Sequence, residues 1–342
     1  MSGNRFDLTI QALHGQASLT DPPVFSMWKH FPSKDRSVRD SVEAHVTFQE
    51  RHRSDLIKIS PHGRYCVVDW GCEISHDVQP DTGSTYVTRH AINSLEDWER
   101  IDEVDPLDGE LGWQVRIVEE LARKYANSYP MMMTLFLPTM VADKLAPKGL
   151  FLQHLREDPK LVKDRVQVIT KVKTEWGRAC LDAGADGLFL ATQHAQPLAN
   201  WGVPEWRKWV VPLNKPLIST LSKKAEFLVA HLHGSDVFFG PVVAEYPVTA
   251  VNWHATETSP SLAEAGKIKH FSGGLLGGLG EPDLEELAET KEDVTTFLQE
   301  RLAEARGLLG RVILAPGCVV PLSVPDERLD VLSAALRDLP PP

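Results

Sequence analysis

The chain has 342 residues, 42% hydrophobic and 24% charged, which is the composition of a soluble globular protein. Its net charge of −11 argues against nucleic acid or an anionic membrane as the main partner, because both attract basic surfaces. The absence of a membrane-length apolar run and of a signal peptide, together with four scattered cysteines, indicates a cytoplasmic protein without a disulfide framework.

The first third of the chain mixes short strands with helices. Ser94 followed by Asp97 is a capping-box pattern, which predicts a helix that begins at Leu95. We expect strands at residues 24–28 and 55–60, a further apolar run at 65–70, a loop or irregular hairpin at 76–90, and helices at about 6–13, 38–52 and 111–125.

From residue 130 the pattern becomes regular. Strands are expected at 130–137, 186–191, 227–231, 248–253, 270–273 and 311–315. Helices are expected up to 181 with a break near Pro159, and then at 204–223, 261–265, from Pro282 to about Leu309, and 326–336. The glycine-rich stretch 272–280 lacks the order of a dinucleotide or phosphate-binding motif, so we interpret it as a tight turn at a rim that can bind an anion.

The strands are continuously apolar and alternate with helices, which is typical of a parallel sheet buried on both faces. About eight such units favour a (β/α)8 TIM barrel over an open sheet. We therefore predict an α/β fold with one barrel domain over residues 1–342 and an N-terminal helical or loop extension.

Active sites of such barrels lie at the carboxyl ends of the strands. Polar and aromatic residues collect there in this chain, and each is a candidate for the pocket: Trp28, His30, Lys58, Asp69, Gln193, His194, His231, His233, Asn252, Trp253, His254 and Cys318. Taken singly, such a residue is more often a structural residue of the rim, so the informative observation is that they collect on one side of the barrel.

The sequence FLVAHLHGSD carries the sharpest signal. His231 and His233 lie two residues apart at a strand end, so both side chains point to the same face. Cys318 follows the last strand, and a thiolate with two imidazoles favours zinc over magnesium or calcium. Three protein ligands leave a fourth position open, for which Asn252 and His254 are candidates, either directly or as supporting residues.

The chain resembles the superfamily of uroporphyrinogen decarboxylase and the zinc-dependent, cobalamin-linked methyltransferases. The resemblance is carried by NRFDLTIQALHG, GADGLFLATQHA, FLVAHLHGSD, VTAVNWHAT, FSGGLLGGLGEP and ILAPGCVVPLSVPDERLDVLSAAL, and covers nearly the whole chain. It implies a (β/α)8 barrel.

The two branches of the superfamily imply different chemistry. The decarboxylase branch uses an arginine-rich loop after the first strand, where this chain has MWKHFPSKDR, and a tyrosine whose place falls near Lys144. The methyltransferase branch binds zinc through a His-x-Cys pair and a later Gly-Cys turn. Those positions hold His231, His233 and Cys318 here, and a carboxylate ligand of some relatives falls near Asn252.

The leading hypothesis is a zinc enzyme that transfers a one-carbon group, with corrinoid (cobalamin) as methyl donor or acceptor and a corrinoid protein as partner. His231, His233 and Cys318 are its predicted metal ligands, His30, Lys58 and His194 its candidate catalytic residues. Substrate binding is assigned to Trp28, Asp69, Gln193, Asn252, Trp253 and His254.

Two alternatives remain open. One is a metal-independent decarboxylase, a lyase in which Lys58 and a histidine handle a carboxylate and a proton. The other is a non-catalytic protein that binds a tetrapyrrole or corrinoid. A small-molecule substrate is expected for either enzyme, and the decarboxylase relatives form homodimers, so the resemblance on that branch implies a homodimer.

Overall fold

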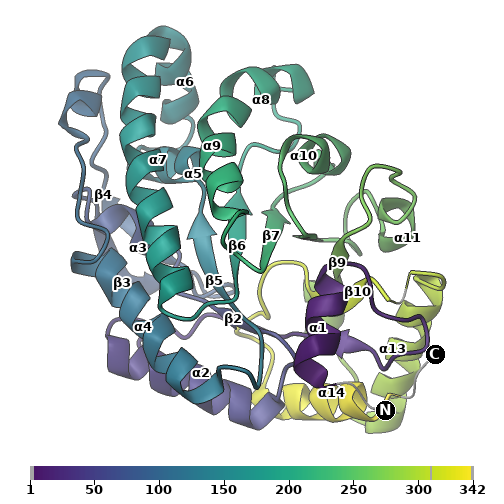
Figure 1. Cartoon of the computed structure of the whole chain (residues 1–342). Coiled ribbons are helices and arrows are strands. Elements are labelled where there is room, and N and C mark those ends of the chain that lie inside the picture. Colours follow the sequence, from purple (N-terminus) through teal and green to yellow (C-terminus); the bar gives the residue numbers. More distant parts are fainter. Residues whose placement is uncertain (1–3, 309, 340–342) are drawn as a thin grey trace.

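The computed structural model describes residues 4–308 and 310–339. Eight parallel strands form one curved sheet in the order β1-β10-β9-β8-β7-β6-β5-β2, which confirms the predicted α/β barrel class (Figure 1). The strands are β1 (Val24–Phe25), β2 (Ile57–Ile59), β5 (Met131–Phe136), β6 (Gly187–Thr192), β7 (Phe227–Leu232), β8 (Ala250–Trp253), β9 (Gly274–Leu279) and β10 (Val312–Pro316).

Helices follow the strands and cover the outside of the sheet (Figure 1). They are α1 (Arg5–Leu13), α2 (Val38–His52), α3 (Tyr65–Val68), the 3-10 helix η1 (Glu96–Arg100), α4 (Gly109–Tyr125), α5 (Pro138–Leu145), α6 (Leu150–Glu157), α7 (Pro159–Asp182), α8 (Val203–Trp209), α9 (Val211–Leu221), α10 (Phe239–Glu245), α11 (Leu262–Ala265), α12 (Glu281–Glu285), α13 (Lys291–Glu304) and α14 (Asp326–Asp338). Within the described residues no helix is both long and apolar enough to cross a membrane.

The barrel closes at a seam between β1 and β2. The Asp55 backbone N–H donates to the Phe25 carbonyl at 3.0 Å, and the Asp55 carboxylate accepts the Phe25 N–H at 3.0 Å. The Ser26 hydroxyl donates to the Leu56 carbonyl at 2.7 Å. Side-chain hydrogen bonds therefore replace most of the backbone ladder between β1 and β2, because β1 is too short to form it. Asp55 also forms an ion pair with Arg5, which fixes α1 to the seam.

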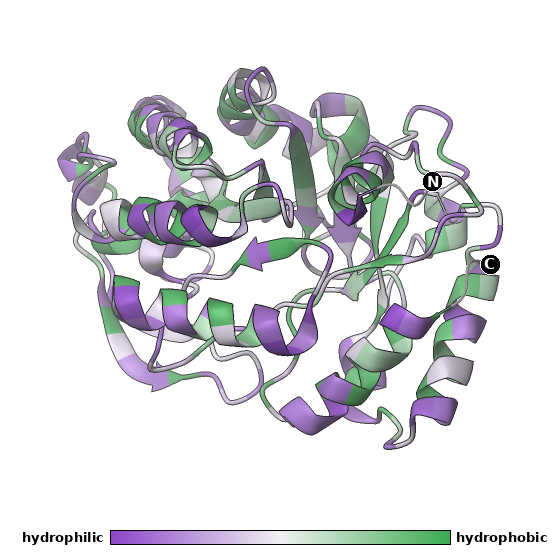
Figure 2. Ribbon diagram, turned by 60° about the horizontal axis from the view of Figure 1, so that its bottom comes forward, coloured by the Kyte–Doolittle hydropathy of each residue, from purple (hydrophilic) through white to green (hydrophobic). Residues whose placement is uncertain are grey.

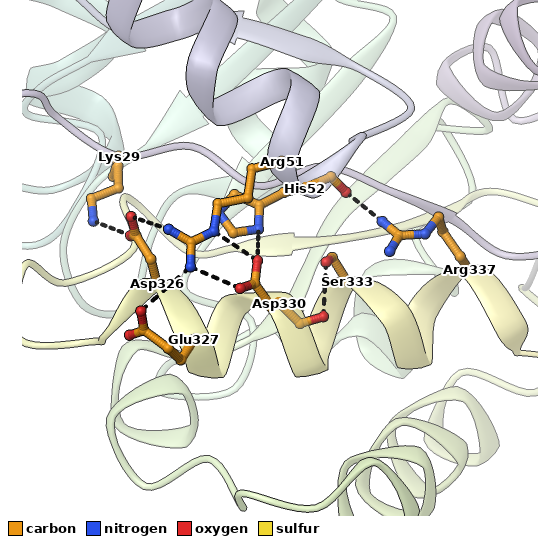
Figure 3. Close-up of polar contacts among 8 residues, drawn as sticks. All are labelled: Lys29, Arg51, His52, Asp326, Glu327, Asp330, Ser333 and Arg337. Carbon is orange, nitrogen blue, oxygen red and sulfur yellow. Dashed lines mark hydrogen bonds and ion pairs between the residues drawn. The ribbon is translucent and has the colours of Figure 1, made fainter.

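The first and last helices of the barrel are joined by charged contacts (Figure 3). Arg51 of α2 forms ion pairs with Asp326 and Asp330 of α14 at 3.1 and 2.8 Å. Arg337 donates to the His52 carbonyl at 2.8 Å, so the two helices are linked along their length. This contact closes the helical layer outside the seam.

The core has two layers, one inside the barrel and one between the sheet and the helices. Figure 2 shows that the strands between these layers are largely hydrophobic, whereas the helices alternate hydrophobic and hydrophilic residues. Alternate residues of each strand supply them, because successive side chains point to opposite faces. In β7, Phe227 and Val229 belong to the inner layer, whereas Leu228, Ala230 and Leu232 belong to the outer one. The inner layer is sealed below by Leu8, Ala12 and Leu13 of α1.

Two sequence predictions about elements need correction. The helix expected from Pro282 is split into α12 and α13, and its expected end at Leu309 lies outside the described residues. The apolar run at 65–70, for which the sequence named no element, contains helix α3. The strand predicted at 270–273 lies further along the chain, as β9 at Gly274–Leu279. It falls within residues 272–280, for which the sequence pattern predicted a tight turn. The glycines of β9 permit a close approach: a Cβ on Gly274 would lie 2.8 Å from the Ala12 and Leu13 carbonyl oxygens.

The expected hairpin at 76–90 is present as β3 (Glu73–Val78) and β4 (Thr85–Arg89), which pair antiparallel. Its tip reaches the carboxyl end of the barrel, where the Leu322 N–H donates to the Asp81 carbonyl at 2.9 Å. The tip residues Gln79, Thr82 and Ser84 line the cavity described next.

Candidate active site at the barrel mouth

The inward-facing residues of the strands continue beyond the inner core layer into a cavity at the carboxyl end, called here the barrel mouth. In β7 the inward series Phe227 and Val229 continues with His231 and His233, and both histidines line the cavity. The predicted orientation of the two imidazoles is therefore confirmed. In β8 the inward positions are Ala250, Asn252 and His254 by the same alternation.

The cavity has a volume of about 220 Å³. Its walls come from many elements: His30, Lys58, Ser60, Pro61, Gly63, Arg64, Gln79, Thr82, Ser84, Thr134, Phe136, Met140, Lys144, Phe189, Ala191, His231, His233, Cys318 and Val319. Three of these residues are lysine or arginine and none is an aspartate or glutamate, in a chain whose net charge is −11.

A group of metal-ligating side chains lies at one wall of this cavity. His233, His254 and Cys318 each offer a ligand atom, and these atoms lie within 4.8 Å of one another. Two members, His233 and Cys318, belong to the predicted metal triad. The third member is His254, which the sequence had placed at the open position or in the pocket rather than in the triad.

His231 lies beside this group rather than in it. Its Nδ1 contacts the Asn252 amide oxygen at 2.7 Å, its ring stacks on Phe189 with centroids 5.0 Å apart, and its centroid is 6.0 Å from that of His233. Burial and the nearby His233 lower the pKa of His231 well below its usual value, so the ring is neutral at pH 7. The grouping thus differs from the predicted triad, in which His231 was a ligand and His254 was a candidate for the fourth position or a supporting role.

Asn252 is fully buried and has no contact with open space. Its amide nitrogen donates to the carbonyls of Leu276 and Pro316 at 3.1 and 2.9 Å, which fixes the amide oxygen toward His231. Asn252 therefore orients a site histidine, in agreement with a supporting role and not with direct substrate contact.

Glu281 holds two of the three clustered residues in place. One carboxylate oxygen accepts the Cys318 N–H at 2.7 Å, and the other contacts His254 Nδ1 at 3.2 Å. Burial acts to raise the pKa of Glu281, but the hydrogen bonds with His254 and Glu257 outweigh it and lower that pKa to about 2. Since Nδ1 of His254 is engaged by Glu281, Nε2 is the nitrogen left for a metal.

Cys318 lies at the centre of the mouth, and the Trp28 indole N–H donates to its carbonyl. Burial, reinforced by the negative charge of Glu281, raises the pKa of the Cys318 thiol to about 12. The thiol is therefore protonated at pH 7 without a metal, whereas coordination to zinc deprotonates a thiol.

Lys58 projects from β2 into the floor of the cavity. Its Nζ lies 4.6 Å from the Phe189 ring centroid and 5.5 Å from that of Trp28, and donates to the Ser60 hydroxyl at 3.0 Å. Burial lowers the pKa of Lys58 to about 7. Trp28, predicted to bind substrate, is buried in the inner core layer, where its ring lies beside the Lys58 amine.

His30 also lines the cavity, as predicted. Its Nδ1 is buried without a hydrogen-bond partner in the described part of the chain. Burial, with a contribution from the positive charge of Lys58, lowers the pKa of His30 to about 3. The imidazole is therefore neutral at pH 7 and free to accept or donate one hydrogen bond to a ligand.

Besides Trp28, Asn252 and His254, four further predicted site residues do not line the cavity. Both Asp69 oxygens accept backbone N–H groups at the start of α4, at 2.9 and 2.8 Å, so Asp69 caps a helix. Trp253 belongs to the outer core layer, because it occupies an outward position of β8. Gln193 and His194 lie in the loop after β6 and contact Asp143 of α5. The Gln193 amide nitrogen donates to the Asp143 carboxylate at 2.9 Å, and His194 Nε2 lies 3.3 Å from that carboxylate.

Residues that were not among the predicted site residues complete the site. Arg64 precedes α3, Lys144 belongs to α5, and both line the cavity with Lys58. Glu257 and Glu281 form a second group with His254, whose ligand atoms also lie within 4.8 Å of one another. A signal for Glu281 was present, because the segment GLGEP places a carboxylate directly after a barrel strand.

Comparisons with known proteins agree with this architecture. The family model described as "Uroporphyrinogen decarboxylase (URO-D)" matches residues 28–339. A methyltransferase from Methanosarcina mazei superposes with a TM-score of 0.76 at 16% identity, covering 98% of each chain. A B12-independent methionine synthase from Shewanella sp. W3-18-1, in complex with selenomethionine, gives 0.53 at 12% identity, covering 94% of this chain and 97% of that one. No curated protein matched the sequence.

Proposed function

The chain belongs to the uroporphyrinogen decarboxylase family of enzymes, and we propose that within this family it is a zinc-dependent methyltransferase. In this proposal it transfers a one-carbon group to or from a small molecule or a thiol. The observation that carries the proposal is the grouping of Cys318 with His233 and His254 at the barrel mouth.

The donor set fits zinc. One sulfur and two imidazole nitrogens are the ligands that zinc prefers, and three protein ligands leave an open position for substrate. Ligand atoms of a tetrahedral zinc site are separated by about 3.5 Å, so donors already within 4.8 Å of one another need only a small adjustment. Burial lowers the pKa of His233, which keeps its ring neutral and able to bind a metal.

Zinc bound there would supply Lewis acidity, either toward a thiol or toward a bound oxygen ligand. The residues of the chain have separate tasks in this proposal. Glu281 orients His254 and Cys318, and Asn252 orients His231 beside the open position. The cationic floor at Lys58 binds the substrate.

We also propose a corrinoid as the methyl donor or acceptor. This rests on the sequence resemblance and on the name of the Methanosarcina neighbour, a methyltransferase. The other neighbour is named as B12-independent, so the corrinoid requires a test separate from the zinc. Loss of the methylcobalamin absorbance on incubation with the enzyme and a thiol measures the transfer directly.

The zinc content of purified protein tests the metal site. We expect about one zinc per chain in the wild type and large losses in His233→Ala, His254→Ala and Cys318→Ala. His231→Ala is the informative comparison, because the sequence predicts a ligand there and the arrangement favours His254. Zinc lost from His231→Ala but kept by His254→Ala would restore the sequence-based triad, and a zinc-free wild type would end the proposal.

The cationic cavity also favours a second candidate, a metal-independent decarboxylase. Lys58, Arg64 and Lys144 face the cavity together, as a site for a carboxylate substrate requires. His30, with an unpartnered Nδ1 beside them, is a candidate for handling a proton. Release of carbon dioxide from a carboxylate substrate by chelator-treated protein would support this candidate against the methyltransferase.

A further inference from the structure

The basic side chains of the cavity differ in their acidic neighbours: Asp143 lies near Arg64 and Lys144, whereas the buried Lys58 amine has no carboxylate neighbour among the described residues. Within the described residues, Lys58, Arg64 and Lys144 form no ion pair with a carboxylate, and no aspartate or glutamate lines the cavity. Lys58 is 6% exposed and its amine has one polar contact, the Ser60 hydroxyl. Buried charges are normally paired, so this cationic pocket is built to receive an anionic group.

A second pocket of opposite charge adjoins the first. This acidic pocket has a volume of about 470 Å³ and is lined by Asp81, Glu257, Glu281 and Glu285, without a lysine or arginine among its described lining residues. Glu281 is engaged by Cys318 and His254, whereas Glu257 is 37% exposed and lies 3.5 Å from His254 Nδ1. Four carboxylates face at most two imidazoles, so this pocket stays negative and favours a cationic group.

The two pockets share one wall, made of Thr82, His233, Cys318 and Val319. Two of the three clustered metal-ligating residues therefore lie at the boundary between the positive and the negative half of the barrel mouth. A molecule that extends from one pocket into the other passes Cys318 and His233 with its middle part.

We propose that the substrate of this site is a small zwitterion, with an acid group at Lys58 and an ammonium group at Glu257. The charges fix its orientation, because the reversed molecule would bring like charges together at both ends. The inference rests on the proposed function, because it concerns the same site and names the class of substrate that this site binds. Amino acids with a primary ammonium and betaines with a quaternary ammonium share this chemistry.

Binding measured by titration calorimetry tests the proposal without turnover. The probes are 4-aminobutyrate, its acid half butyrate and its amine half butylamine, with 3-aminopropionate and 6-aminohexanoate to vary the separation of the charges. We expect at least one zwitterion of the series to bind about tenfold or more tightly than either half of the same length. The trimethylammonium analogue of that zwitterion separates a betaine site from a primary ammonium site.

Two variants that each remove one charge test which residue binds the acid end of the ligand and which binds the ammonium end. Lys58→Met should weaken the zwitterion and the acid about tenfold or more but leave the amine unchanged, whereas Glu257→Gln should weaken the zwitterion and the amine only. Lys223→Met and Glu300→Gln, which change exposed residues outside both pockets, are the matched controls and should leave binding unchanged. An intact circular dichroism spectrum shows that each variant is folded.

The proposal is overturned if the acid half binds as tightly as the zwitterion, if Glu257→Gln changes nothing, or if no member of the series binds. The titrations are made with zinc-loaded and with chelator-treated protein. Selective zwitterion binding to protein that holds no zinc would uphold the substrate class while the proposed metal chemistry fails, so the two failures are distinguishable.

Discussion

At the scale of single residues, the site contains a buried lysine that a stable apolar core would not include. Lys58 occupies an inward position of β2 where its neighbours along the barrel, Trp28 and Phe189, are apolar. An ammonium group there loses its hydration and gains only two aromatic faces and one hydroxyl. Such a residue lowers the stability of the fold, and its presence is explained by binding rather than by packing.

Replacing Lys58 should therefore stabilise the protein. We expect Lys58→Met to raise the free energy of unfolding by about 1–2 kcal/mol at pH 7 in chelator-treated protein, measured by urea denaturation. The control Lys223→Met, an exposed position, should change it by less than about 0.5 kcal/mol.

The pH dependence of this difference follows from the pKa of Lys58, which is about 7 in the folded protein and 10.5 when unperturbed. Between these values the unfolded chain holds a proton that the folded chain has released, so wild-type stability rises with pH across this window. The advantage of Lys58→Met should shrink from pH 7 to pH 10. A difference that stays constant over this range would show that the Lys58 amine is not destabilised by burial.

At the scale of elements, the seam between β1 and β2 lacks the continuous backbone ladder that joins the other neighbouring strands. β1 has two residues, and the contact across the seam relies on Asp55, on the hydroxyls of Ser26 and Ser54, and on one backbone hydrogen bond. Because His30 follows β1 and Lys58 belongs to β2, the seam also sets the distance between two walls of the cavity.

Removal of the Asp55 carboxylate should open this seam. Asp55→Ala leaves the Phe25 N–H and the Arg5 guanidinium without their acceptor, and we expect a loss of about 2–3 kcal/mol in the free energy of unfolding. Asp7→Ala, on the exposed face of α1, is the matched control and should change stability little. Equal losses in the two variants would contradict a special role for the seam.

The elements also show what sequence patterns can and cannot predict. Helix α2 has the bounds that its pattern predicted, because an N-cap serine, a long polar face and an adjacent apolar stripe agree there. Strand β9 was missed because its sequence, GLLGGL, has the composition of a turn. Gly274 is required by the carbonyl groups of Ala12 and Leu13 in α1, which come close only in the folded protein.

At the scale of the whole molecule, the site exists only after the barrel has closed. His233, His254 and Cys318 follow three different strands, and their grouping depends on the order in which β7, β8, β9 and β10 pair. The two-residue alternation predicted that His231 and His233 share a face, and the same alternation separates inward His254 from outward Trp253. Glu281 contacts both His254 and Cys318 and so favours His254 as the neighbour of Cys318. It lies on a different element from either residue, and a local sequence pattern does not predict such a contact.

Because the metal group joins distant strands, metal binding should stabilise the whole fold. We expect a chelator to lower the Tm of zinc-loaded wild type by about 5–10 °C, measured by differential scanning fluorimetry, since a ligand that binds only the folded state adds its binding free energy. Cys318→Ser should show a much smaller chelator effect. An unchanged Tm in the wild type would indicate that no metal links these strands.

Helix α1 seals the lower end of the inner core layer, at the opposite end of the barrel from Cys318. The first described residue, Asn4, therefore emerges on the side remote from both charged pockets. A sensor surface coupled through an N-terminal tag should hold the molecules with their openings toward the flowing solution. Immobilised protein should then bind small molecules as readily as protein that tumbles freely.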